Sequence, residues 1–131
     1  MEKLIYIGFG GFLGANTRYM VSVSLVNWLS TTLGWQSVAG TIFVNVTGSF
    51  LLGVFISLTQ RIILPENTRL LVATGFFGAY TTFSTFANES VAMLREGDWW
   101  HGLSNIIVTN ALCLLGALLG ILIASRLWSS T

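Results

Sequence analysis

Residues 75–87 read GFFGAYTTFSTFA, and this stretch decides how the third apolar segment of the chain can fold. It places four Thr and Ser hydroxyls among phenylalanines, after two glycines, Gly75 and Gly78. Glycine is costly inside a helix, and Thr and Ser can bond to their own backbone, so we do not expect a regular helix through residues 75–82. A break at membrane depth is tolerated only where it lines a cavity or is buried in protein. The alternative is an unbroken helix whose small residues pack closely against neighbouring helices.

The composition of the whole chain indicates an integral membrane protein. Of its 131 residues, 53% are hydrophobic and 8% are charged, and the mean hydropathy is +0.76. A soluble domain of this size needs more polar surface. One cysteine allows no intrachain disulfide or thiolate metal cluster, and one histidine with five acidic residues offers little for catalysis. We therefore expect no enzyme, and the six scattered Lys and Arg residues indicate no nucleic-acid partner.

Hydropathy divides the chain, residues 1–131, into four segments of a single transmembrane domain, at about residues 4–28, 36–60, 68–96 and 99–126. Each segment can cross the roughly 30 Å hydrocarbon core at about 1.5 Å per residue. Tryptophans favour the membrane interface, and all five lie at segment ends: Trp28, Trp35, Trp99, Trp100 and Trp128. The expected fold is an all-α integral membrane protein with four transmembrane helices, the third broken near the middle of the membrane.

One arginine lies deep in the first segment. Counted from Leu4, Arg18 is roughly 21 Å along a helix, too far for its side chain to reach that interface easily. A central arginine costs about 2.5–3.5 kcal/mol on the insertion scale, so such residues usually face a bundle interior or water. We expect Arg18 to serve function or an interhelical hydrogen bond. On the same helical face, Gly10 and Gly14 form a G-x-x-x-G pair suited to close packing.

Polar residues of the other segments fall at similar depths. Asn45 lies roughly 14 Å into the second segment and Thr109 roughly 15 Å into the fourth, level with the group at residues 81–85. Hydroxyls and a carboxamide without a buried acid suit a desolvated ion, although Asn45 can equally serve as a plain interhelical hydrogen bond. The positive edges of phenylalanine rings and the deep arginine favour an anion. Four helices mostly fill their own core, so the path requires an oligomer.

Three motifs, in this order, resemble the Fluc/CrcB family of fluoride channels: GGFLGANTRY at residues 10–19, GT at 40–41 followed by Val44, Asn45 and Gly48, and TTFSTF at 81–86. The resemblance covers essentially the whole chain. It implies a passive, fluoride-selective channel of the bacterial cytoplasmic (inner) membrane, which exports fluoride and relieves its toxicity. It also implies an antiparallel, dual-topology homodimer, surrounded by lipid, with two pores.

The resemblance further implies roles for particular residues. Asn45 would be a hydrogen-bond donor that lines the fluoride path, and the ring edges of Phe83 and Phe86 would lie along it. Thr109 and Cys113 would form the opposing track on the fourth segment. Serine or threonine is usual along this track, so the cysteine departs from the family pattern.

Other residues would lie at the ends of the path or at the dimer interface. The resemblance implies that Arg18 lies at an aqueous vestibule and Glu89 near a pore entrance. It implies that Gly78 and Thr81 offer backbone carbonyls to a structural sodium ion between two subunits. Oxygen ligands are those a hard cation prefers.

The charge distribution of the chain disagrees with dual topology. With the N-terminus inside, Lys3, Arg61, Arg69 and Arg126 face the cytoplasm against Arg95 outside, whereas dual topology usually accompanies little bias.

Two alternative functions remain. The first is a small proton-coupled multidrug exporter, which would need an acid within the first segment, where the chain has an arginine. A non-transporting assembly subunit needs no polar residues aligned at mid-depth.

Overall fold

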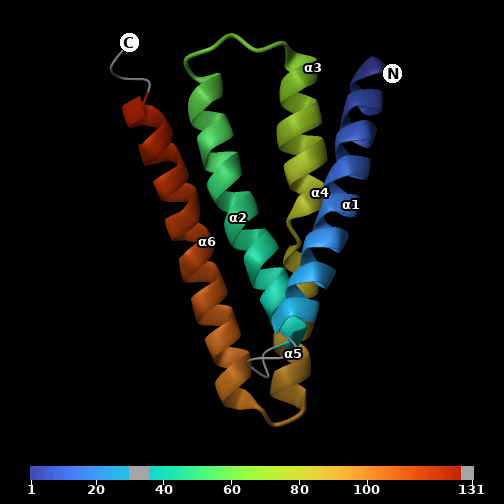
Figure 1. Cartoon of the computed structure of the whole chain (residues 1–131), viewed down its shortest axis with the longest axis vertical. Helices are drawn as coiled ribbons and strands as arrows, with labels where there is room; N and C mark the ends of the chain where they lie inside the picture. Colours follow the sequence, from blue (N-terminus) through green and yellow to red (C-terminus); the bar gives the residue numbers. More distant parts are fainter. Residues whose placement is uncertain (30–35, 128–131) are drawn as a thin grey trace.

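The computed structural model describes residues 1–29 and 36–127, and for residues 36 and 37 the backbone only. Trp35 and Trp128 therefore lie outside the described residues. The described part of the chain is helical, without a strand (Figure 1). Its elements are α1 (Glu2–Leu29), α2 (Gln36–Thr59), α3 (Glu66–Arg69), the π-helix η1 (Leu70–Phe77), α4 (Gly78–Tyr80), α5 (Phe83–Arg95) and α6 (Trp99–Leu127). The four predicted segments therefore match the observed helical stretches to within two residues at each end.

Three helical stretches of the described chain are long and apolar enough to cross a membrane: Val38–Thr59, Glu66–Arg95 and Trp99–Leu127. The 28-residue α1 is as long, but it is not among them. Asn16 and Arg18 lower its hydropathy in the middle of the helix. By length and composition, the protein is a multi-pass membrane protein.

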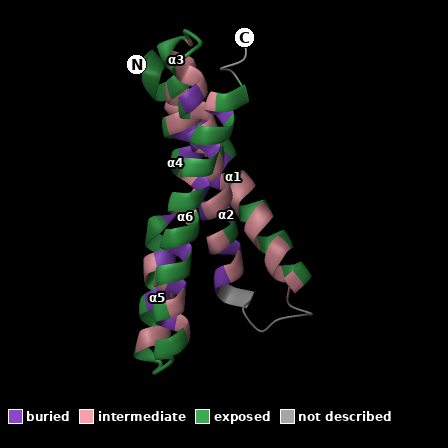
Figure 2. Cartoon of the chain, turned by 90° about the vertical axis from the view of Figure 1, so that its left-hand side faces the viewer, coloured by how far each residue is buried: buried purple, intermediate pink, exposed green. Residues whose placement is uncertain are grey.

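The helices run alternately up and down the molecule. The start of α1 and the end of α6 lie at the same end (Figure 1). Helix α1 packs along η1 and α4, and α2 packs along α6. Helices α1 and α6 carry large apolar side chains that are exposed, and Figure 2 marks the exposed residues of both helices in green. Leu114 on α6 and Phe12 on α1 are examples, and such faces suit lipid or another subunit.

Glycines bring α1 and η1 into backbone contact. A Cβ added at Gly10 would meet the Leu71 carbonyl, and one added at Gly14 would meet the Phe76 carbonyl. Viewed from η1, a Cβ on Gly75 would lie 2.7 Å from a carbonyl oxygen of α1. The G-x-x-x-G pair therefore serves close helix packing, as its spacing predicts.

Exchanging Gly10 for alanine is expected to destabilise the subunit by about 1–3 kcal/mol, because the methyl group has no space beside the Leu71 carbonyl. The matched control is Gly8→Ala in the same helix, where an added Cβ meets nothing within 4 Å. Thermal unfolding of the detergent-solubilised protein should show a lower melting temperature for Gly10→Ala alone. Equal melting temperatures for the two variants would contradict the close contact.

The helix that begins at Glu66 is interrupted at two threonines. Helix α4 ends at Tyr80, and Thr81 (φ −86°, ψ 159°) and Thr82 (φ −150°, ψ 109°) are extended. Thr82 then caps α5, because its Oγ1 accepts a hydrogen bond from the backbone N–H of Thr85 at 3.2 Å. Gly78 has helical angles, so the interruption lies at the residues whose hydroxyls can cap a new helix and not at the glycines.

Candidate functional site: two pockets on either side of the helix break

A cavity of about 240 Å³ lies where α2, α5 and α6 meet. It is lined by all five residues expected along the ion path, which are Asn45, Phe83, Phe86, Thr109 and Cys113, and also by Ser49, Leu52, Thr81 and Asn110. These residues lie up to 68 positions apart in the sequence, and only the packing of three helices brings them together. No side chain that lines this cavity carries a charge.

Asn45 binds the backbone of the break. Its Nδ2 donates to the carbonyl of Thr82 at 3.0 Å, and its Oδ1 accepts from the N–H of Thr82 at 2.7 Å. An extended residue inside a bundle has no helical hydrogen bonds, so a buried backbone group there needs another partner. The carboxamide supplies both partners at once. Asn45 therefore holds the break in place, and one of its amide hydrogens remains for the cavity.

The two phenylalanines differ sharply in exposure. Phe83 and Phe86 lie one helical turn apart on α5, with ring centroids 5.5 Å apart and planes inclined at 54°. Phe86 is 6% exposed, whereas Phe83 is 76% exposed. The chain thus encloses one ring and presents the other outward.

Thr109 belongs to a buried chain of hydrogen bonds between α6 and α5. Its hydroxyl donates to Oδ1 of Asn105 at 3.0 Å, and Nδ2 of Asn105 donates to Oγ of Ser90 at 2.9 Å. Ser90 donates in turn to the Phe86 carbonyl at 2.8 Å. Neither Asn105 nor Ser90 was among the expected site residues. The four-residue spacing of Asn105 and Thr109 on one helical face was a usable signal, but nothing in the sequence pairs either with Ser90.

Cys113 lies one turn beyond Thr109 on α6. It is a free, partly exposed cysteine that lines the cavity together with Ser49 of α2. Ser49 lies one turn after Asn45, so a hydroxyl does face the cavity at this level, although it comes from α2 and not from α6. Ser49 is thus a further lining residue outside the expected set.

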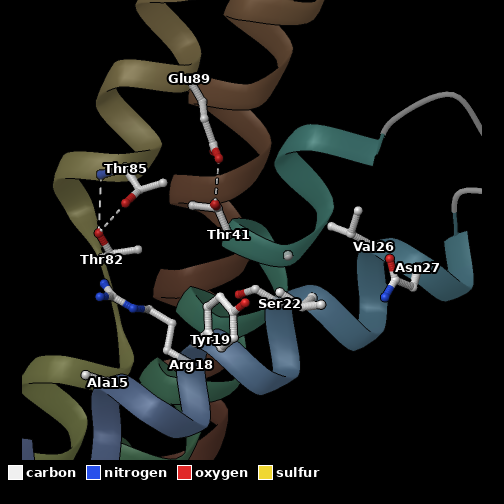
Figure 3. A pocket seen from close by; sticks show the side chains of 12 residues that line it. Ala15, Arg18, Tyr19, Ser22, Val26, Asn27, Thr41, Thr82, Thr85 and Glu89 are labelled. Carbon is white, nitrogen blue, oxygen red and sulfur yellow. Dashed lines mark hydrogen bonds between the residues drawn. The ribbon is translucent and has the colours of Figure 1, made fainter. Parts of the chain in front are cut away.

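A second pocket, of about 480 Å³, lies between α1, α2 and α5 (Figure 3). Both residues expected at the ends of the path, Arg18 and Glu89, line it. In Figure 3 the Arg18 guanidinium points toward Thr82 at the break. Glu89 accepts a hydrogen bond from Thr41 Oγ1 at 2.8 Å through Oε1, while its Oε2 is buried without a hydrogen-bond partner among the described residues. One cation and one carboxylate therefore share this pocket.

The break separates the two pockets. Thr81 lines the smaller cavity and Thr82 lines the larger pocket. Successive side chains of an extended backbone point to opposite faces, so two extended residues suffice to put one threonine on each side. Arg18 and Glu89 thus lie on one side of the break, and the aromatic residues and Thr109 on the other.

Helix α4 begins at Gly78 and is followed by Thr81, and its end diverts a backbone N–H from the Gly78 carbonyl. In a continuous helix the N–H of Thr82 would bond to the Gly78 carbonyl, but it donates to Asn45 instead. Both the N–H and the hydroxyl of Thr81 donate to the Phe77 carbonyl, at 3.1 and 2.9 Å. The C-terminal end of a helix carries partial negative charge, which suits a cation. Gly78 is exposed and lines neither pocket.

No group of three or more His, Cys, Asp or Glu side chains in the described residues could hold a metal ion.

Comparison with known proteins places the chain. A family model described as "CrcB-like protein, Camphor Resistance (CrcB)" matches residues 5–121. The chain is 42% identical over 123 residues to a protein of Campylobacter jejuni (strain 81-176) named fluoride-specific ion channel FluC, with 94% of this chain and 98% of that protein covered. Proteins of the same name from Koribacter versatilis and Shewanella baltica (strain OS185) are each 38% identical, covering 90% and 92% of this chain and 91% and 94% of their own lengths. With most of its length matched by the family and by these relatives, the chain belongs to the CrcB-like family.

Proposed function

We propose that this protein is a passive, fluoride-selective ion channel that lets fluoride leave the cytoplasm of a bacterial cell. The observation that carries the proposal is the cavity in which Asn45, Phe83, Phe86 and Thr109 meet without a charged side chain. The names of the relatives supply the ion. A path lined by hydroxyls, a carboxamide and aromatic edges offers an anion donors and positive ring edges without a fixed countercharge.

The order of the two pockets supports a route for the ion. Fluoride enters the larger pocket, where the Arg18 guanidinium attracts it. It passes the break at Thr82, sheds water and moves along the rings of Phe83 and Phe86 and the hydroxyl of Thr109. Each contact is weak, and conduction requires sites that an ion can both enter and leave.

We further propose that the working channel is an antiparallel, dual-topology homodimer with two pores, in which all four helical stretches span the membrane and the break lies near its middle. A ring that is 76% exposed, as Phe83 is, lacks the second wall that a narrow pore needs. In this proposal a second copy of the chain supplies that wall. The Phe83 of the second copy lines the other pore, where the first copy supplies the wall. The exposed apolar faces of α1 and α6 suit such an interface or lipid.

The proposal also includes a structural sodium ion at the dimer interface, held by the carbonyls of Gly78 and Thr81. The diverted N–H of Thr82 and the helix end support this assignment. Two carbonyls from each of two subunits make four oxygen ligands, which suit a hard cation. A cation bound there would stabilise the dimer by joining two helix ends of partial negative charge.

Gly78→Ala is expected to spare the fold of the subunit but weaken the dimer. Beyond the neighbouring residues of its own helix, the atom nearest to an added Cβ is the Ala73 carbonyl oxygen, 4.0 Å away, so only a close partner would be displaced. Melting temperatures measured in sodium and in choline salts should differ for the wild type, since a ligand at 100 times its dissociation constant stabilises by about 2.7 kcal/mol. The variant should lose this difference. A variant that keeps both the dimer and the sodium dependence would refute the assignment.

Efflux from proteoliposomes tests the proposed function. Vesicles loaded with fluoride or with chloride are treated with valinomycin, so that potassium movement balances the charge, and release is followed with ion-selective electrodes. Fast fluoride release with chloride retained is the expected result. Fluoride retained by vesicles that contain folded dimer would refute the channel, and proton-driven uptake of organic cations would then identify an exporter.

A further inference from the structure

The direction of the buried hydrogen bonds around Asn105 bears on how Thr109 treats an anion. Ser90 donates its only hydroxyl proton to the Phe86 carbonyl, so toward Asn105 it can only accept. The Asn105 group that faces Ser90 is therefore the NH₂, and the group that faces Thr109 is the carbonyl oxygen. The Thr109 hydroxyl consequently donates to Asn105. The three protons that form these hydrogen bonds are therefore directed to other protein atoms and not to the cavity.

Several other hydroxyls on these helices donate to the backbone of their own helix, whereas the hydroxyls of Thr109 and Thr41 donate to side chains. Thr47, Thr81 and Ser90 each donate to the backbone carbonyl four residues earlier, at 2.7, 2.9 and 2.8 Å. Thr109 has the same option in the backbone carbonyl of Asn105, yet its hydroxyl donates to the Asn105 side chain. A helical carbonyl already accepts a backbone N–H, whereas the side-chain oxygen competes for the proton more strongly.

We propose that Asn105 is a positioning residue that controls the strength of the anion contact at Thr109. The proposal rests on the fluoride channel proposed above. While the Thr109 proton lies on Asn105, the hydroxyl offers the cavity an oxygen that repels an anion. Fluoride can gain this donor only if Thr109 turns away from Asn105.

Turning the Thr109 hydroxyl away costs free energy, because it leaves Oδ1 of Asn105 without a donor. Its side chain is 2% exposed, so water cannot replace the donor that Oδ1 loses. A buried acceptor left without a partner is penalised more than an ordinary hydrogen bond contributes. The anchor on Ser90, also 2% exposed, keeps the amide from following the hydroxyl. Fluoride therefore binds weakly at Thr109 and leaves quickly, which suits a conducting site.

Initial fluoride efflux from proteoliposomes, measured over a range of internal fluoride concentrations, tests the proposal. Asn105→Leu has nearly the same volume and no acceptor. It should lower the half-saturating fluoride concentration by about fivefold, the usual scale of one neutral hydrogen bond, and lower the maximal rate as well. In a Thr109→Val background the same leucine should change neither quantity, because no hydroxyl remains to be released.

Two results overturn the proposal. The first is a half-saturating fluoride concentration that is unchanged in Asn105→Leu while the wild type releases fluoride normally. This result would refute the role of Asn105 but not the proposed channel. The second is a change of equal size with and without the Thr109 hydroxyl, which would indicate general disruption of the helix contact. If wild-type vesicles retain fluoride, the channel itself is refuted and this inference with it, so the two failures are distinguishable.

Ser90→Ala keeps the test decisive if the leucine variant does not assemble. It leaves Asn105 and Thr109 in place but removes the anchor of the amide, so the amide can follow the Thr109 hydroxyl. We expect Ser90→Ala to lower the half-saturating fluoride concentration by about twofold, less than Asn105→Leu does. A half-saturating concentration that stays the same or rises in Ser90→Ala would overturn the proposal.

Discussion

Asn45→Leu is expected to reduce fluoride efflux by about a hundredfold or more. The side chain makes both hydrogen bonds to the backbone of Thr82, at 3.0 and 2.7 Å. Leucine would leave a buried N–H and a buried carbonyl without these partners, at about 1–3 kcal/mol each. About 1.4 kcal/mol corresponds to a factor of ten in rate. If the cost of the two unpaired groups raises the barrier to conduction, efflux should fall by two factors of ten or more. Electrode-recorded efflux from proteoliposomes measures the effect.

Asn16→Leu is the matched control. Asn16 is exposed, and its Nδ2 donates to the Phe12 carbonyl within its own helix, so its loss disturbs no second element. Asn45→Asp provides a further comparison, because it keeps the acceptor for the Thr82 N–H but loses the donor and adds negative charge to an anion path. We expect it to conduct no better than Asn45→Leu. Wild-type efflux in a folded Asn45→Leu dimer would refute the role of Asn45.

Phe86→Ala and Phe83→Ala should differ in stability although both should abolish most conduction. Phe86 is 6% exposed, and removing such a ring typically costs about 3–5 kcal/mol. Phe83 is 76% exposed within the chain, so its loss should hardly affect the folding of the subunit. Melting temperatures measured by tryptophan fluorescence should fall for Phe86→Ala and stay close to the wild type for Phe83→Ala.

Phe83→Leu separates the ring from its bulk. Leucine keeps an apolar side chain of similar length but has no positive ring edge for an anion. We expect efflux to fall by about tenfold or more, the size of one aromatic contact of about 1.5 kcal/mol. Normal efflux in the leucine variant would show that bulk alone is needed. A large loss of stability in Phe83→Ala would instead show that a partner subunit buries this ring as firmly as the chain buries Phe86.

The sequence alone determined the fold class and the limits of the helices. Its apolar segments can meet the need of backbone groups for partners in lipid only as helices, and the connections between them are short. The spacing of Gly10 and Gly14 also predicted a close contact, because residues four apart share a helical face. The family resemblance pointed to five of the residues that line the cavity, namely Asn45, Phe83, Phe86, Thr109 and Cys113.

The tertiary structure decided what each of these side chains does. Asn45 is committed to the backbone of Thr82, which lies 37 residues away, and the Thr109 hydroxyl is directed to Asn105 by a serine on another helix. The break lies at two threonines and not at the glycines, because Thr82 can cap α5 and Asn45 can bind its backbone. Residue types and periodicity specify which groups face a neighbour. Which donor meets which acceptor depends on the positions of three helices packed together, and no local pattern carries that information.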